Sequence, residues 1–234
     1  MRWLTLLFLF VSRAAAEPLV NTFSIVAYDP RTGDLGVAVE SKYLAVGAVV
    51  PWARAGIGAV ASQALGKLGY GIEGLELMGQ GKSSEEALEQ LFSADNKRTR
   101  RQVAMIDAKG RVAVRTGDEC MEWAGHRTGE FFSVQGNLLT GENVVAAMAA
   151  AFEKARASGE GELADWMMAA LEAGQAAGGD RRGQQSAALL VVRANGGPGR
   201  DNDRYIDLRV DDHPTPISEL SRLLRLHREF HPRK

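Results

Sequence analysis

A threonine at the start of a predicted strand is the first residue in this sequence that could act as a nucleophile. Thr22 opens the segment 22–28, which is mostly apolar or β-branched. A hydroxyl nucleophile needs a base, and a threonine at a free chain terminus can use its own α-amino group, whose pKa is about 8. Most threonines at strand starts reflect only the β-propensity of this residue. The catalytic interpretation of Thr22 therefore depends on the residues that other elements bring to it.

Polar residues also close the next two predicted strands. Glu40, Ser41 and Lys42 combine an acid, a hydroxyl and an amine at one strand end. A solvated strand end explains this cluster as well as a site does. Ser62 and Gln63 end the following strand, where exposed backbone N–H groups could form an oxyanion hole.

Two loops supply further candidate binding residues. Gln135, Gly136 and Asn137 lead into a predicted helix, and a glycine lets the backbone approach a ligand closely. Loop hydrogen bonds and helix capping are the alternative for the two amides. The segment 178–186 is polar, has glycines at both ends and directly precedes an apolar strand, although a surface turn explains it equally well. Its candidate site residues are Asp180, Arg181 and Ser186.

The sequence lacks the motifs of several other kinds of site. It contains no HExxH, no GxSxG elbow, no Walker A motif and no GxGxxG between a strand and a helix. An internal hydrolase that pairs Ser41 or Ser62 with His126 is a further alternative. The acidic segment 201–213 lacks EF-hand spacing, which favours a solvated turn over a cation site. We therefore expect neither a metal nor a cofactor.

The elements that must position these residues alternate between hairpins and helix pairs. Two apolar runs around the turn 29–33 predict a first hairpin, and the runs around 108–110 predict a second. A strand is expected at 57–61, and apolar spacing predicts helices within 75–91, 141–157, 163–177 and 216–230. Apolar or alternating strands are expected at 186–193 and 204–210. This order predicts an α+β protein with largely antiparallel sheets and helices layered on them, as one domain over 22–230.

The composition of the chain excludes several functional classes. The 234 residues are 45% hydrophobic and 24% charged, which is typical of a folded globular chain. Lys and Arg number 28 against 29 for Asp and Glu, so we expect no nucleic-acid partner. The single Cys120 excludes an internal disulfide and a cysteine-rich zinc site. The 26 glycines exceed the usual share and mark particular backbone positions.

The first sixteen residues predict a secretory signal peptide. Arg2 precedes an apolar run that is too short to span a bilayer, and Ala14 to Ala16 resemble a cleavage site. Cleavage removes Arg2 and Arg13 and leaves 26 basic against 29 acidic residues, a net charge of −3. The pattern thus predicts a signal peptide at 1–16 and a secreted or, in a bacterium, periplasmic protein without a membrane partner.

Several of these segments together carry a resemblance to a known family. The segments 22–27, 41–53, 133–137 and 178–183 closely resemble the family called domain of unknown function 1028 (DUF1028). That family is placed among the Ntn-hydrolase-like proteins, named after their N-terminal nucleophile. The resemblance implies a four-layer αββα sandwich of two antiparallel sheets between helix layers. By analogy with the superfamily, it also implies hydrolysis of amide bonds.

The resemblance also implies roles for particular residues. Thr22 falls where the superfamily has its nucleophile, and a backbone N–H near Ser62 or Gln63 would hold the oxyanion. Asp180 and Ser186 resemble the residues that assist the terminal amine. Two departures stand out: signal cleavage leaves the segment 17–21 ahead of Thr22, and only Lys42 or Arg54 could substitute for the essential lysine of proteasome-type sites.

The sequence supports one leading hypothesis and one main alternative. The leading hypothesis is a secreted amidohydrolase or peptidase that acts on a small amide or peptide substrate through Thr22, once a second cut has freed that residue. The alternative is a catalytically silent module of the same fold that binds a small molecule or cell-wall fragment through Gln135, Asn137 and Asp180. Both hypotheses allow a homo-oligomer.

Overall fold

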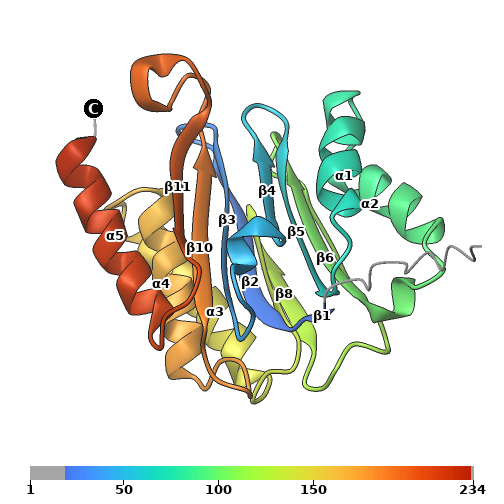
Figure 1. The fold of residues 1–234 in the computed structure, drawn as a ribbon. Helices are drawn as coiled ribbons and strands as arrows, with labels where there is room; N and C mark the ends of the chain where they lie inside the picture. Colours follow the sequence, from blue (N-terminus) through green and yellow to red (C-terminus); the bar gives the residue numbers. More distant parts are fainter. Residues whose placement is uncertain (1–18, 233–234) are drawn as a thin grey trace, which may run out of the picture.

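Two antiparallel sheets form the centre of this computed structural model, which describes residues 19–232 (Figure 1). The predicted signal peptide lies outside the described residues. In the first sheet the strand order is β1-β5-β6-β7, and β4 also pairs with β5. Its strands are β1 (Leu19–Val20), β4 (Pro51–Arg54), β5 (Gly58–Leu65), β6 (Arg101–Asp107) and β7 (Val112–Thr116).

The second sheet has six strands in the order β11-β10-β3-β2-β9-β8. Every pairing within it is antiparallel. Its strands are β2 (Thr22–Asp29), β3 (Asp34–Ser41), β8 (Gly125–Gly129), β9 (Phe132–Gly136), β10 (Ser186–Val192) and β11 (Arg204–Val210).

Helices cover the outer face of each sheet. The first sheet is covered by α1 (Gly69–Gly79) and α2 (Ser84–Ser93), and the second by α3 (Asn143–Ala157), α4 (Leu163–Ala176) and α5 (Pro216–Phe230). The predicted four-layer α-β-β-α arrangement is therefore confirmed. No helix in the described part of the chain is long and apolar enough to span a membrane.

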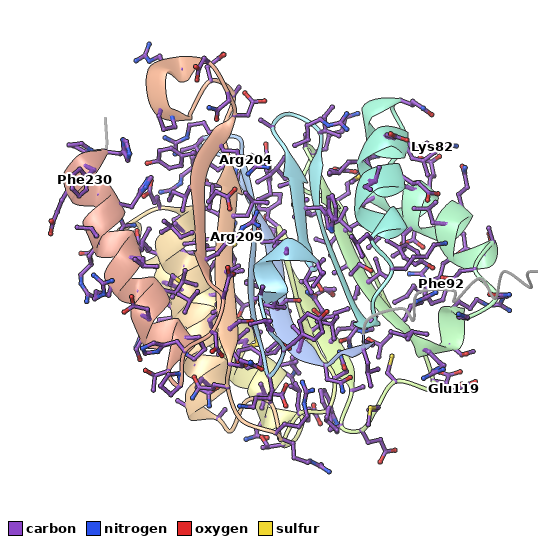
Figure 2. The ribbon with its side chains drawn as sticks, in the orientation of Figure 1. Lys82, Phe92, Glu119, Arg204, Arg209 and Phe230 are labelled. Atoms are coloured by element: carbon purple, nitrogen blue, oxygen red, sulfur yellow. The ribbon has the colours of Figure 1, made fainter. Side chains whose placement is uncertain are left out.

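Strand alternation divides the buried residues of β2 and β3 between two cores. Val26 and Val39 face the other sheet in a core between the sheets, whereas Ile25 and Ala38 pack against the helices. Side chains fill the space between the two sheets (Figure 2). Because successive side chains of a strand point to opposite faces, this division also fixes which strand-end residues can meet between the sheets.

Local sequence signals explain how the main elements begin and turn. Ser83 and Glu86 form a capping box at the start of α2: Ser83 Oγ accepts from the Glu86 N–H at 3.2 Å, and the Ser83 N–H donates to Glu86 Oε2 at 2.8 Å. Gly33 and Gly110 have φ angles of 78° and 73°, which the two hairpin turns require and glycine adopts without strain.

The main difference from expectation is at β8 and β9. The segment 133–137 was expected to lead into a helix, but residues 133–136 belong to β9 and α3 begins only at Asn143. Ser133 and Gln135 face the other sheet, where they form hydrogen bonds instead of an apolar contact. Phe132 and Val134 alternate with these two polar residues and pack against the helices, so the five-residue strand does carry a period-2 pattern, with its polar side turned inward.

Candidate functional site

Three hydroxyl residues lie in one row across the second sheet. Thr22 of β2 is directly opposite Ser41 of β3, and Ser41 is directly opposite Ser186 of β10. Directly opposed residues share a face of the sheet. All three are fully buried, on the face that meets the first sheet. The structure thus brings together three residues that are far apart in the sequence.

The peptide bond between Asn21 and Thr22 is held at the end of this row. Thr22 Oγ1 donates to Ser41 Oγ at 3.1 Å, and Ser41 Oγ donates to the carbonyl oxygen of Asn21 at 2.5 Å. Arg182 Nη2 donates to the same carbonyl oxygen at 2.8 Å. Two donors on one carbonyl polarise it towards nucleophilic attack, as in an oxyanion hole.

Asp180 fixes the guanidinium of Arg182. Arg182 Nε lies 3.0 Å from Asp180 Oδ1, and Arg182 Nη2 lies 2.6 Å from Asp180 Oδ2. The carboxylate also accepts the backbone N–H of Lys42 at 3.3 Å. The Asp180 side chain is fully buried, whereas that of Arg182 is 32% exposed. This bidentate pair fixes Nη2, which donates both to Asp180 Oδ2 and to the Asn21 carbonyl.

Buried amides hold the backbone of Thr22 in place. The Thr22 N–H donates to the Asn137 carbonyl at 3.3 Å, and the Asn137 N–H donates back to the Thr22 carbonyl at 3.0 Å. Gln63 Nε2 adds a 3.3 Å bond to the Thr22 carbonyl and a 2.8 Å bond to Gln102 Oε1. Asn137 Nδ2 donates to the same Gln102 oxygen at 3.0 Å. Thr22 is therefore positioned by both sheets.

The hydrogen bonds continue into the sandwich as an inter-sheet polar network. We use this name for Ser24, Gln63, Gln102, Ser133, Gln135 and Asn137. Gln135 Nε2 donates to Ser24 Oγ at 2.7 Å, and Ser133 Oγ donates to Gln135 Oε1 at 2.8 Å. Gln102 Nε2 donates to the Gly136 carbonyl at 2.9 Å. Gln135 and Gly136 thus support the site through this network.

Several predicted site residues lie elsewhere or have other partners. Lys42 Nζ donates to the Gln184 carbonyl at 3.0 Å on the exposed side, away from Thr22. Ser186 Oγ bonds the Tyr43 carbonyl and the Val46 N–H, which fixes the turn after β3. The Arg181 side chain is exposed, and its backbone N–H binds Leu138.

The backbone N–H groups expected to form an oxyanion hole are not both available. The Ser62 N–H donates to the Val50 carbonyl at 3.3 Å, and Ser62 Oγ donates to the Lys67 carbonyl at 3.0 Å. Ser62 also lies on the helix-facing side of β5, next to Val60 in alternation. The carbonyl donors in the structure are instead Ser41 and Arg182 side chains.

Glu40 lies on the opposite face of β3 from Ser41. It is directly opposite Phe23 and Ala187, which both pack against the helices. Its carboxyl is completely buried, and neither oxygen has a hydrogen-bond partner. Burial, followed by the nearby charge of Asp180, raises the pKa of Glu40 well above its usual value. Glu40 therefore lies behind the hydroxyl row in surroundings that favour its protonated form.

The histidine alternative finds no support in the contacts. His126 Nδ1 lies 2.9 Å from Thr116 Oγ1, whereas Ser41 and Ser62 bond to other groups. Within residues 19–232, no group of three or more His, Cys, Asp or Glu side chains could hold a metal ion.

The sequence profile of a family of unknown function, DUF1028, matches residues 22–220. The chain belongs to the DUF1028 family. A crystal structure of protein SPO2555 from Silicibacter pomeroyi, also of DUF1028, is 33% identical, covers 89% of each chain and has a TM-score of 0.79. Anbu (ancestral beta-subunit) from Yersinia bercovieri is 12% identical, with 91% of this chain and 98% of Anbu covered and a TM-score of 0.40. No curated protein matches the chain.

Four residues around Thr22 in this DUF1028 chain are not among the candidates that the sequence offered. Asn21, Ser24, Gln102 and Arg182 all contact the Thr22 site or its supporting network. Arg182 is two residues after Asp180, a spacing that allows a salt bridge between the two side chains. The neighbouring Arg181 carries the same charge, so the sequence alone does not distinguish the two arginines. The choice between the two arginines depends on the turn that presents them.

A separate cavity of about 730 Å³ lies at the other end of β10 in this DUF1028 chain. Its lining includes Arg193, Tyr205, His227 and Phe230. Figure 2 shows Phe230 at the end of α5, near this end of the molecule. Ser186 begins β10 at the Thr22 end, and Arg193 follows its last residue, so the cavity and the Thr22 site are distinct.

Proposed function

We propose that this protein is an amide hydrolase of the N-terminal nucleophile type, with Thr22 as its nucleophile after cleavage of the Asn21–Thr22 bond. One observation carries the proposal: the Asn21 carbonyl accepts hydrogen bonds from Ser41 and Arg182 while the Thr22 hydroxyl donates to Ser41. Nucleophile, proton acceptor and polarised carbonyl thus lie together. The family match also begins at Thr22.

The same contacts provide a route for the chain to cleave itself. The Thr22 hydroxyl attacks the Asn21 carbonyl carbon, its proton passes to Ser41 Oγ, and the Ser41 proton passes to the carbonyl oxygen. The resulting tetrahedral intermediate is neutral. Its collapse breaks the C–N bond and returns the hydroxyl proton to the Thr22 nitrogen. An Asn21 ester on Thr22 Oγ1 remains, and water hydrolyses it to a carboxylic acid and the free hydroxyl.

The freed Thr22 then has the groups needed for turnover. Its α-amino group accepts the hydroxyl proton as Oγ1 attacks a substrate amide, and it returns the proton to the departing amine. Arg182 and the Ser41 hydroxyl stabilise the developing oxyanion in the place where they now bind the Asn21 carbonyl. Water hydrolyses the acyl-enzyme and restores Thr22.

The fold and the resemblance support the proposal by analogy. The four-layer arrangement matches the one expected for Ntn-hydrolase-like proteins, and Thr22 stands at the first residue of a central strand. We further propose that the protein is secreted or periplasmic, on the pattern of residues 1–16.

The catalytically silent binding module is the competing function. It is favoured by the complete burial of Thr22 and by the two hydrogen bonds that hold the Asn21 carbonyl. In that case the Asn21 segment would be a permanent part of the fold, and Ser41 and Arg182 would hold it in place.

The N-terminal residue of the exported protein decides between the two. We expect intact-mass measurement to show a chain that begins at Thr22, together with hydrolysis of at least one member of an amide panel. Thr22→Ala and Ser41→Ala should retain Asn21. Ser62→Ala is the matched control, because it removes one buried serine hydrogen bond outside the site. A wild-type chain that keeps Asn21 yet hydrolyses amides would exclude Thr22 as the nucleophile.

A further inference from the structure

The segment before Thr22 is bound to the sheet as an added strand. Leu19 is directly opposite Leu65, and Val20 is directly opposite Ala64, in an antiparallel pairing of β1 with β5. β4 pairs with residues 58–61 and β6 pairs with the other edge of β5. β1 therefore occupies the remaining piece of one edge. Extended peptides commonly bind proteins by adding a strand in this way.

The three residues of this segment are buried to different degrees. Val20 is fully buried in the core between the sheets, and Asn21 is only 2% exposed. Leu19 is 43% exposed. The site thus encloses the residue at the carbonyl and the one before it, while the third faces solvent.

The Asn21 side chain occupies a partly polar position. Its Nδ2 donates to Met121 Sδ at 3.5 Å, and its Oδ1 is buried without a hydrogen-bond partner. Asn137 Oδ1, close to Thr22 in the same network, is also buried and unpartnered. The position thus holds a small polar side chain, whose amide faces the weak thioether acceptor of Met121.

We infer that residues 19–21 mark the acyl side of the substrate site, which takes an extended peptidyl amide with asparagine at the scissile carbonyl and valine before it. The inference rests on the proposed function, because cleavage must first empty the site. The substrate then adds to the edge of β5 as β1 does now. Thr22 Oγ1 forms an ester with the asparagine carbonyl carbon, the amine leaves with a proton, and water releases the peptide acid.

The test uses the wild-type exported protein, shown by mass to begin at Thr22. The probes are aminocoumarin amides of acetyl-Leu-Val-Asn, acetyl-Leu-Val-Phe, acetyl-Leu-Lys-Asn and acetyl-Ser-Val-Asn. Because the valine position is apolar and closed, replacement by lysine should lower kcat/KM by about 10-fold or more. Phenylalanine at the asparagine position should lower it similarly, whereas serine at the exposed third position should change it less than about 3-fold.

A variant and a binding measurement keep the inference independent of turnover. Met121→Ala should reduce the preference for asparagine over phenylalanine, whereas Met78→Ala, on the far side of the first sheet, should not. The acid acetyl-Leu-Val-Asn should bind more tightly than acetyl-Leu-Lys-Asn in calorimetry.

The outcomes separate the inference from the proposed function. Hydrolysis of other amides through Thr22 without a preference for Val-Asn, or equal binding of the two acids, would overturn the substrate class and leave the nucleophile intact. A chain that never begins at Thr22, or a Thr22→Ala protein that remains active, would overturn both.

Discussion

Ser24 of β2 and Gln63 of β5 join the two sheets through a 2.6 Å hydrogen bond from Ser24 Oγ to Gln63 Oε1. Both side chains are fully buried. The same Gln63 amide also reaches the Thr22 carbonyl. The position of the nucleophile is therefore tied to the contact between the sheets.

Replacement of Gln63 by leucine should destabilise the protein and slow its cleavage. Ser24, Gln102 and the Thr22 carbonyl would each lose a hydrogen bond in a buried place. With about 1–3 kcal/mol for each unsatisfied buried group, and some relaxation, we expect the free energy of unfolding to fall by about 3 kcal/mol. Urea denaturation measures the change. Gln90→Leu, on the exposed side of α2, should shift it little, and an equal loss in both variants would contradict the role of Gln63.

Arg182→Ala should slow the cleavage of the Asn21–Thr22 bond by about 100-fold, the usual effect of losing one oxyanion donor. The rate can be followed by mass spectrometry after synthesis of the precursor. Arg181→Ala is the control, since it removes the same charge one residue away and leaves the Asn21 carbonyl contacts in place. Equal rates in the two variants would show that Arg182 plays no part.

Asp180→Asn should slow the cleavage of the Asn21–Thr22 bond, as Arg182→Ala does, but by a smaller factor. The neutral amide weakens the bidentate interaction between residue 180 and the Arg182 guanidinium. A smaller fraction of the molecules then has Arg182 bound to the Asn21 carbonyl. We expect slower cleavage by about 10-fold, between wild type and Arg182→Ala. If the double variant is slower than Arg182→Ala alone by the same factor, the two residues act separately and the positioning role is wrong.

Glu40→Gln should stabilise the protein increasingly as the pH rises. Because burial raises the pKa of Glu40, the folded chain keeps a proton that the unfolded chain releases above about pH 4.3. The contribution of Glu40 to the free energy of unfolding is largest below that pH. It falls as the pH rises towards the folded-state pKa, by at most about 1.4 kcal/mol per pH unit. Denaturation at pH 5 and pH 8 measures the gain, with exposed Glu76→Gln as control. A gain that does not grow with pH would show that Glu40 is ionised in the fold.

Cys120 should react slowly with thiol reagents while the protein is folded. Burial raises the pKa of its thiol to about 11, and Sγ donates to the Arg101 carbonyl at 3.3 Å. At pH 8 only about one thiol in a thousand is then the reactive thiolate. A colour assay with a disulfide reagent should show rapid reaction only after denaturant is added. Prompt reaction of the folded protein would contradict the buried assignment.

The sequence predicted the layers of the fold better than its sheet edges. Apolar periodicity located the strands around Val26 and Val37 and the long helices, because those elements bury continuous apolar faces. The short strands β1 and β4 and the polar strand β8 lack that signal, and β9 has it over only five residues. Their pairing depends on partners distant in the chain, which no local pattern encodes.

The site was predicted by residue type and only partly by position. Strand register and alternation bring several of the predicted residues to one end of the space between the sheets. These residues are Thr22, Ser41, Gln63, Asn137 and Asp180. Lys42 follows the inward-facing Ser41 by one position, and Ser62 precedes the inward-facing Gln63 by one position. The same alternation therefore points both side chains away from the space between the sheets. A shift of one residue along a strand decides between the two outcomes.

Removal of the strand β1 would place a titratable group at the site. The Thr22 nitrogen is now an amide that donates to the Asn137 carbonyl, and it carries no charge at any ordinary pH. Cleavage of the Asn21–Thr22 bond would make it an amine, whose ordinary pKa is about 8, and residues 19–21 would no longer cover it. Protonation of that amine would remove its capacity to act as a base, so proton uptake at one nitrogen would control the processed protein and not the precursor.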